Sequence, residues 1–387
     1  MKPPAQKRKI MPIFGTRPEA IKMAPLVLAL QNHPDMDCVV TVTGQHREQL
    51  DQVLASYNIT PAHDLAIMKQ GQTLADISTG ILTHLTPILA QEKPDMVLVH
   101  GDTTTSFAAG LAAFYQQIAI GHVEAGLRSG DKYQPFPEEI NRKLLTHVAD
   151  LHLAPTTLSR RNLLAENITE HVYVTGNTAI DAIRHNPDHH YHIEPLNQVV
   201  ANAKTNNHRV VLLTAHRREN LGEPLANICD AVNQLCQAYP QLRFVYPVHK
   251  NPVVRDTVYA KLADNPQVLL TEPLETADMH NLMSQSWLVL TDSGGLQEEA
   301  PFFDVPVLVL RAVTERPEGL ETGVLKLVGT DSRSIVTGVS QLMDDPTTYT
   351  TMQTGKNPYG DGQASERIVE CIRYYYGQRE TPPVSFS

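Results

Sequence analysis

The sequence predicts an α/β protein built from two Rossmann-like domains, and three observations support this. The chain has 387 residues, more than a single hydrophobic core usually serves. Short runs of apolar and β-branched residues alternate with amphipathic segments of helical length, which is typical of parallel strands flanked by helices. These runs form two series, separated by a polar stretch.

The elements are predicted from apolar runs and from helical spacing of apolar residues. The strands of the first series are Ile10–Phe14, Cys38–Thr43, Met96–His100, Ile118–Val123 and Val172–Thr175. Those of the second series are Val210–Thr214, Arg243–Pro247, Val268–Leu270, Trp287–Thr291 and Val305–Leu310. The clearest helices between them are Ala20–Asn32, Leu225–Tyr239 and Pro252–Leu262.

The alternation pauses between Ala182 and His208, so a domain boundary is predicted near 176–208. The first domain is expected at 1–180 and the second at 181–362. Four histidines lie in the polar stretch, at His185, His189, His190 and His192. They could bind a metal ion, but such a group is more typical of a solvated loop, and no metal is expected.

The end of the chain is predicted to hold one more helix, at about 363–378. Ile368, Val369 and Ile372 recur there at helical spacing, and the helix is expected to pack back on the first domain. The following tail, 379–387, contains two consecutive prolines and is expected to be disordered.

Composition excludes several classes of protein. The net charge of −10 disfavours nucleic-acid binding, which needs a basic surface. No apolar run approaches the ~20 residues of a membrane span, and the apolar run after the basic start is too short for a signal peptide. The four cysteines lack the spacing of a zinc or redox motif, so they are interpreted as reduced thiols of a cytoplasmic protein.

The loops after the predicted strands are rich in reactive residues, and ligands of a doubly wound sheet bind at this edge. The first loop is Gly15-Thr16-Arg17-Pro18-Glu19, with Lys22 one turn into the helix. The helix N-terminus, Arg17 and Lys22 could hold an anion; the alternative is a plain strand–helix turn. No Gly-x-Gly-x-x-Gly follows a strand, which weighs against a bound dinucleotide.

Three carboxylates follow the next predicted elements: Asp102, Glu124 and Glu138. Asp102 is either the N-cap of a helix or a functional group. Glu124 follows buried positions and is either paired with Arg128 or used in acid–base chemistry. Glu138 and Arg142, four apart, could form an ion pair on one helix face. Carboxylates held close together can have pKa values driven apart, as paired acid and base chemistry requires.

The second series carries anion-binding groups. His216 and Arg217 follow one strand and suit a phosphate or a leaving group, or form a satisfied surface cluster. The run Ser293-Gly294-Gly295 joins another strand to a helix, where the glycines let backbone N–H groups approach a diphosphate. Glu299 suits a ribose diol, and Arg316 adds another strand-end cation.

Together these segments resemble the non-hydrolysing UDP-N-acetylglucosamine 2-epimerases over about Ile10 to Ile372. The matching segments are Phe14-Gly15-Thr16-Arg17-Pro18-Glu19-Ala20-Ile21-Lys22, Val99-His100-Gly101-Asp102, His122-Val123-Glu124-Ala125-Gly126-Leu127-Arg128, Pro137-Glu138-Glu139-Ile140-Asn141-Arg142, Ala215-His216-Arg217-Arg218-Glu219, Thr291-Asp292-Ser293-Gly294-Gly295, Thr314-Glu315-Arg316-Pro317-Glu318 and Asn357-Pro358-Tyr359-Gly360-Asp361-Gly362. The resemblance implies a glycosyltransferase-B-like fold with a central cleft, a homodimer, no cofactor, and UDP-N-acetylglucosamine and UDP as ligands.

The resemblance also implies residue roles. Residues around the reacting sugar would be Asp102, Glu124, Glu138, Arg142 and His216. Residues holding the uridine diphosphate would be Arg17, Lys22, His216, Ser293, Gly294, Gly295, Glu299 and Arg316, with Met279 in place of the family's aromatic residue at the base. Phe302-Phe303-Asp304 and Ala312-Val313 also depart from the family pattern.

Some members of the family bind a second substrate molecule that activates the enzyme. The matching positions are Gln45, Glu48, Gly71, Arg217 and His249. Glu48 and Gly71 replace an amide and a basic residue there, so a weakened or absent activator site is expected. The other functions considered are a hydrolysing epimerase, a glycosyltransferase and a silent nucleotide-sugar sensor; the sensor would not need the three carboxylates.

Overall fold

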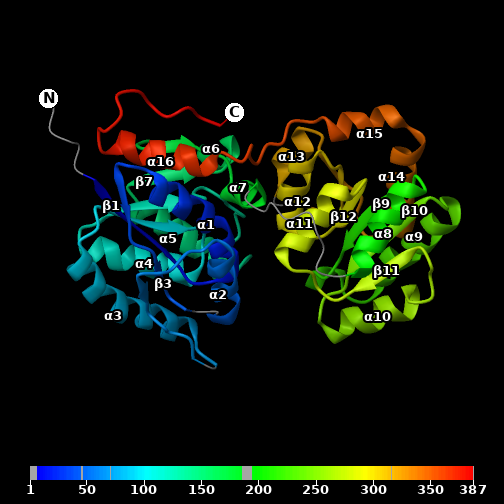
Figure 1. Ribbon diagram of the computed structural model, residues 1–387, viewed down its shortest axis with the longest axis horizontal. Helices are drawn as coiled ribbons and strands as arrows, with labels where there is room; N and C mark the ends of the chain where they lie inside the picture. Colours follow the sequence, from blue (N-terminus) through cyan, green and yellow to red (C-terminus); the bar gives the residue numbers. More distant parts are fainter. Residues whose placement is uncertain (1–6, 45–46, 70, 185–193, 315, 387) are drawn as a thin grey trace. The chain divides into compact units, whose positions relative to one another are not determined.

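A computed structural model describes residues 7–44, 47–69, 71–184, 194–314 and 316–386 (Figure 1). The chain divides into two compact units: unit 1 lies within residues 1–185 and 359–387, and unit 2 within 186–358. The predicted boundaries, at 180/181 and 362/363, fall close to these. Each unit is a parallel sheet with helices on both faces, which is the predicted α/β class.

Unit 1 holds an eight-stranded sheet in the order β4-β3-β1-β5-β6-β7-β8, with β2 also paired to β1. The strands are β1 Arg8–Phe14, β2 Met36–Cys38, β3 Thr41–Val42, β4 His63–Asp64, β5 Met96–His100, β6 Ala119–Val123, β7 Leu151–Ala154 and β8 Val172–Val174. The helices are α1 Arg17–Asn32, α2 Arg47–Ser56, α3 Leu74–Glu92, α4 Thr104–Tyr115, α5 Glu138–Val148, α6 Thr157–Ala165, α7 Thr178–Arg184 and α16 Ala364–Tyr375.

Unit 2 holds a six-stranded sheet in the order β11-β10-β9-β12-β13-β14. The strands are β9 Arg209–Thr214, β10 Leu242–Pro247, β11 Val268–Thr271, β12 Leu288–Thr291, β13 Val307–Val309 and β14 Leu325–Leu327. The helices are α8 Glu194–Thr205, α9 Glu223–Ala238, α10 Pro252–Leu262, α11 Thr276–Gln285, α12 Gly294–Glu299, α13 Pro317–Glu321, α14 Ser332–Asp344 and α15 Pro346–Gln353, with 3₁₀ turns η1 Arg218–Asn220 and η2 Ala300–Phe303.

The sheet order places the candidate residues. Strands β1, β5 and β6 are neighbours, so the turns after Phe14, His100 and Val123 leave the same edge of the unit 1 sheet side by side. In unit 2, β9 and β12 are neighbours in register, with Thr214 opposite Thr291, so the turns that follow them are also adjacent. Parallel pairing therefore gathers residues that lie far apart in sequence.

The C-terminal helix α16 packs on unit 1, as Figure 1 shows for the red helix among blue and green elements. Its residues Ile368 and Ile372 are fully buried in the same core cluster as Met23 and Leu26 of α1. The carboxylate of Asp181 accepts hydrogen bonds from the backbone N–H groups that open α16, at 2.7 Å from Ser365 N. A buried carboxylate thus caps the helix that returns to the first unit.

Two segments outside the predicted elements differ from what the sequence suggested. The polar stretch between the units contains a helix, α8, because Leu196, Val200 and Ala203 give it a buried face at helical spacing. The four histidines of that stretch lie outside the described residues. The tail, expected to be disordered, is anchored at its end: Phe386 is buried and its N–H donates to the Val174 carbonyl at 2.9 Å, while most of the residues before it are exposed.

Within the described parts of the chain, no helix is long and apolar enough to cross a membrane.

The predicted strand Cys38–Thr43 is two short strands, β2 and β3, which both pair with β1. Three strands had no sequence prediction: β4, β7 and β14, each of four residues or fewer.

Candidate functional site

The turn after β1 is built around a buried carboxylate, Glu19. Its Oε2 accepts hydrogen bonds from Gly15 N at 3.0 Å and Thr16 N at 2.8 Å, and Thr16 in turn caps α1. Its Oε1 accepts from the hydroxyls of Thr103, at 2.5 Å, and Ser106, at 2.9 Å, beyond β5. Glu19 therefore ties two strand-end turns together. The Thr-x-x-Glu spacing of a capping box signals half of this role; the link to the second turn depends on the fold.

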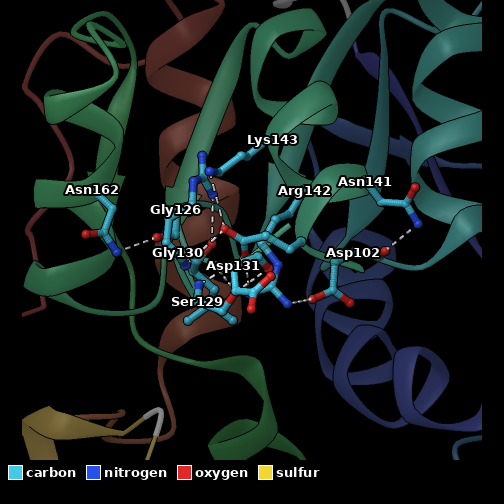
Figure 2. A network of polar contacts seen from close by, with 12 residues as sticks. Asp102, Gly126, Ser129, Gly130, Asp131, Asn141, Arg142, Lys143 and Asn162 are labelled. Carbon is cyan, nitrogen blue, oxygen red and sulfur yellow. Dashed lines mark hydrogen bonds and ion pairs between the residues drawn. The ribbon is translucent and has the colours of Figure 1, made fainter. Parts of the chain in front are cut away.

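Asp102 leaves the end of β5 and is paired with Arg142 of α5, which lies 2.6 Å from its Oδ2 (Figure 2). The helix after β5 is capped by Thr103, whose hydroxyl accepts from Ser106 N, so the N-cap interpretation of Asp102 was wrong. The side chain of Asp102 is 25% exposed and stays within reach of a ligand. Burial raises the pKa of Asp102, and the Glu124 charge adds to this, although Arg142 opposes both.

Glu124 leaves the end of β6 in a left-handed backbone conformation, with φ of 64°. Its Oε2 lies 2.5 Å from Lys22 Nζ and 3.6 Å from His100 Nε2. Burial alone would raise the pKa of this carboxyl, but Lys22 and His100 outweigh it and hold the pKa well below its usual range. Asp102 and Glu124 thus have pKa values shifted in opposite directions.

Two ion pairs considered from the sequence are corrected. Arg128 pairs with Glu166, at 2.6 Å, rather than with Glu124. Arg142 pairs with Asp102 and with Glu139, at 3.5 Å, rather than with Glu138. Spacing along a helix permits a pair, but a partner from another element competes, and the fold brings Asp102 closer.

Glu138 is the first residue of α5, and its Oε2 is buried without a hydrogen-bond partner among the described residues. An acceptor left in this state is costly, so it needs a ligand or a water molecule as its partner. Its neighbour Glu139 is fully buried and accepts from the N–H groups of Ser129, at 3.0 Å, and Gly130, at 3.3 Å. Figure 2 shows this network, which holds the loop before α5 against the helix.

Lys22 and Arg17 were expected to hold an anion. The structure gives Lys22 a different partner, because its ammonium neutralises Glu124. Arg17 is the first residue of α1 and is partly exposed at the helix N-terminus, where an anion is favoured. An anion at either of these two cations stays a prediction.

Unit 2 is organised by Asp292, a fully buried carboxylate directly after β12. Its Oδ2 accepts from His216 N and Arg217 N, both at 2.8 Å, and from the Asn220 amide at 2.9 Å. It thereby fixes the whole turn after β9. In the sequence, the only signal of this role is an acidic residue next to a buried strand.

His216 stacks on His249, with ring centroids 5.1 Å apart and planes 6° apart. Its Nδ1 lies 3.6 Å from Asp292 Oδ1. Burial lowers the pKa of His216, and Asp292 only partly offsets this, so the ring is neutral near pH 7. His249, expected at the activator position, therefore lies directly beside a residue expected at the reacting sugar.

The turn of Ser293, Gly294 and Gly295 opens α12, and two guanidinium groups lie over it. A Cβ built on Gly294 would lie 3.6 Å from an Nη2 of Arg316 and 3.7 Å from an Nη2 of Arg217. Arg316 is held by an ion pair with Glu298. Two positive charges above a glycine turn favour a bound anion such as a diphosphate. Arg217, expected at the activator position, thus lies over the turn of Ser293, Gly294 and Gly295.

The remaining predicted residues have these positions. Glu299 Oε2 lies 3.3 Å from Nε2 of the buried His280, and a Cβ on Gly295 would lie 3.4 Å from Glu299 Oε1. Met279 is a partly buried residue of α11. Gly71 has φ of +71° and open space around its α-carbon. Gln45 and the side chain of Glu48 lie outside what the structure describes. No group of three potential metal ligands occurs among the described residues.

Two parallel, helix-covered sheets with anion-binding turns at their strand ends define a glycosyltransferase-B-like, nucleotide-binding class. The family model "UDP-N-acetylglucosamine 2-epimerase" matches residues 28–373. A UDP-N-acetylglucosamine 2-epimerase of Bacillus subtilis is 53% identical over 383 residues, 99% of each chain. The chain belongs to the UDP-N-acetylglucosamine 2-epimerase family, whose members are isomerases.

Solved structures of epimerases of this family share the fold of this chain. The UDP-GlcNAc 2-epimerase of Neisseria meningitidis bound to UDP-GlcNAc is 48% identical, with a TM-score of 0.83, and the match covers 95% of this chain and all of the other. The Methanocaldococcus jannaschii enzyme in complex with UDP-GlcNAc and UDP is 34% identical, with a TM-score of 0.73, over 95% of this chain and 99% of the other. The glycosyltransferase-B-like fold expected from the resemblance is confirmed.

Proposed function

We propose that the chain is a non-hydrolysing epimerase that interconverts UDP-N-acetylglucosamine and UDP-N-acetylmannosamine. The observation that carries this is the pair Asp102 and Glu124, two carboxylates beyond adjacent strands whose pKa values are shifted in opposite directions. Inversion of a carbon centre by proton removal and return needs one acid and one base at the same pH. Relatives with UDP-GlcNAc bound support the substrate.

The reaction proceeds by elimination and re-addition. A carboxylate takes the proton from sugar C2, the C1–O bond to UDP breaks, and a C1=C2 double bond forms, which gives 2-acetamidoglucal and UDP. UDP then adds back to C1 while a proton is returned to the opposite face of C2. Glu124, ionised because of Lys22, is the group that accepts the proton. The return of a proton to C2 is assigned to Asp102, the carboxyl whose pKa burial raises. No electrons are gained or lost, so no nicotinamide is needed.

The other residues bind the sugar and UDP and stabilise the charge on the departing diphosphate. Glu138 and Arg142 contact the sugar, the first through its unpartnered oxygen and the second while it orients Asp102. The proposed UDP ligands are Arg17, His216, Ser293, Gly294, Gly295, Glu299 and Arg316, with Met279 at the base. Arg217 joins them because its guanidinium lies over Gly294. Such preorganised donors stabilise the charge that develops on the departing diphosphate.

Proton and phosphorus NMR of UDP-N-acetylglucosamine incubated with the protein tests this function. We expect an equilibrium mixture of two UDP-sugars that differ at C2, with free UDP and glycal only in traces. Stoichiometric release of UDP with free N-acetylmannosamine would instead establish a hydrolysing epimerase. Turnover that requires an added sugar acceptor would establish a glycosyltransferase.

Activation by a second substrate molecule is proposed to be weak or absent, because Glu48 and Gly71 supply no cation. Initial rates from pure UDP-N-acetylmannosamine test this: a long lag, abolished by a trace of UDP-N-acetylglucosamine, would contradict it. The homodimer and the cytoplasmic location stay predictions, and light scattering at several concentrations tests the first.

A further inference from the structure

Two side chains hold the turn that carries Asp102, and each donates a hydrogen bond to a backbone carbonyl of the turn. The two carbonyls are consecutive along the chain. The amide of Asn141 donates from Nδ2 to the carbonyl oxygen of Asp102 at 3.0 Å (Figure 2). The Nε2 of His122 donates to the carbonyl oxygen of Gly101 at 2.8 Å. Asn141 is 7% exposed and His122 is fully buried, so water does not compete for either bond.

The environment of His122 decides which atom donates in its hydrogen bond to the Gly101 carbonyl. Burial lowers the pKa of His122 to about 3, so the ring is neutral near pH 7. A neutral imidazole carries one N–H, and a carbonyl can only accept, so the proton must be on Nε2. Gly101 itself adopts a φ of +66°, a conformation that favours glycine. The turn is therefore fixed by its own backbone on one side and by His122 on the other.

Asn141 and Arg142 are consecutive residues of α5, and both reach Asp102. Asn141 binds its main-chain oxygen, and Arg142 lies 2.6 Å from its carboxylate. The fully buried Glu139 fixes α5 in turn, by accepting from the N–H groups of Ser129 and Gly130. The direction of the Asp102 carboxylate is thus set from one helix at two points.

We infer that Asn141 is a positioning residue that orients the Asp102 carboxylate toward the reacting sugar carbon, and this rests on the proposed function. A free Asp102 peptide could rotate about the flanking bonds while Arg142 followed the carboxylate, so the ion pair alone does not fix the position of the carboxylate. A displacement of about 1 Å at a reacting group can cost about 100-fold in rate. The amide of Asn141 prevents that displacement.

The test compares Asn141→Ala with a matched control, Asn233→Ala. The control also loses an amide bond from Nδ2 to a backbone carbonyl, that of Lys261 at 3.1 Å, but it lies between two helices of unit 2. Asn233→Ala further loses the bond that its Oδ1 accepts from the Asn265 amide at 2.8 Å, so its thermal midpoint should fall at least as far as that of Asn141→Ala. Only Asn141→Ala should lose turnover: we expect kcat to fall by about 10- to 100-fold with KM within about threefold.

A second variant, Asn141→Asp, keeps the shape of the side chain and removes the donor, so it decides the matter if Asn141→Ala does not fold. Each variant is also combined with Asp102→Asn. Because Asn141 acts through Asp102, the double variants should be no slower than Asp102→Asn alone, whereas independent roles would multiply. In Asn141→Ala, the limb of the pH–rate profile that reports Asp102 should move toward lower pH, since a displaced carboxylate becomes more hydrated.

Turnover of both Asn141 variants within about twofold of the Asn233→Ala control would overturn the inference. Independent, multiplying losses in the double variants would overturn it as well. The proposed function fails in a different way: the parent enzyme would not invert C2, or Asp102→Asn would keep full activity. An active parent, a slow Asp102→Asn variant and unchanged Asn141 variants would leave the function standing and remove only the positioning role.

Discussion

Replacing Lys22 with Met separates two roles for this lysine. In the structure its ammonium lies 2.5 Å from Glu124, whose side chain is only 10% exposed. An opposite charge this close lowers the pKa of a carboxyl by about 1 to 3 units, so its removal should raise the pKa of Glu124 by about that amount. The buried carboxyl then also loses the partner that offsets its desolvation. His100, at 3.6 Å, remains and keeps the change toward the lower end of that range.

The consequence is a shift of the acid limb in the pH–rate profile. In the parent enzyme Lys22 holds the pKa of Glu124 well below its usual range, so kcat/KM should fall only at strongly acid pH. In Lys22→Met the acid limb should move to higher pH by about one unit or more, while the rate near pH 8 stays within about tenfold of the parent. Initial rates of UDP-N-acetylmannosamine formation, measured as a function of pH, provide the assay.

Lys261→Met is the matched control, because it removes a lysine that lies 2.6 Å from the carboxylate of Asp230 in a partly exposed pair. Such pairs contribute about 1 kcal/mol or less, and its pH–rate profile should match that of the parent. The reasoning would be refuted if Lys22→Met kept the profile of the parent and raised only KM. That result would return Lys22 to the anion-binding role that the sequence suggested.

Three further predictions concern other buried groups. Glu138→Gln should lower kcat by at least about 100-fold, with Glu166→Gln near parent level; equal rates would make Glu138 structural. Asp292→Asn replaces the charged carboxylate that accepts three N–H bonds with a neutral amide, which holds the turn after β9 less firmly. The affinity for UDP should therefore fall by about tenfold or more, and an unchanged Kd by calorimetry would contradict this. Burial lowers the pKa of His122 from 6.5 to about 3, so stability is present above 6.5 and is lost as pH falls toward 3. About 2 kcal/mol should be lost by pH 5 in urea titrations, and equal stability at pH 7 and 5 would contradict it.

Much of the fold follows from local pattern. The strand Met96–His100 and the helix Pro252–Leu262 have the bounds that apolar periodicity predicts. The helix α8 escaped prediction because its polar residues outnumber Leu196, Val200 and Ala203, and no strand signal flanks it on its N-terminal side. The strands β4, β7 and β14 were missed because two to four residues carry too little periodicity to stand out.

The site was predictable in position but not in pairing. Strand ends in a parallel sheet share one edge, so residues after β1, β5 and β6 had to be neighbours whatever their partners. Which cation meets which carboxylate depends on side-chain reach across elements. Lys22 therefore contacts Glu124, and Arg142 contacts Asp102 instead of Glu138. The roles of Glu19 and Asp292 escaped for the same reason, since each bonds to a turn distant in sequence.

Deuterium uptake at sugar C2 tests the central claim most directly. UDP-N-acetylglucosamine is incubated with the protein in deuterated water without added NAD, and proton NMR follows C2 of both UDP-sugars. Proton removal by one carboxyl and return by the other predicts UDP-N-acetylmannosamine that carries deuterium at C2 from the first turnover. Epimerised product that retains its original C2 proton would contradict elimination and re-addition, and with it the roles given to Asp102 and Glu124.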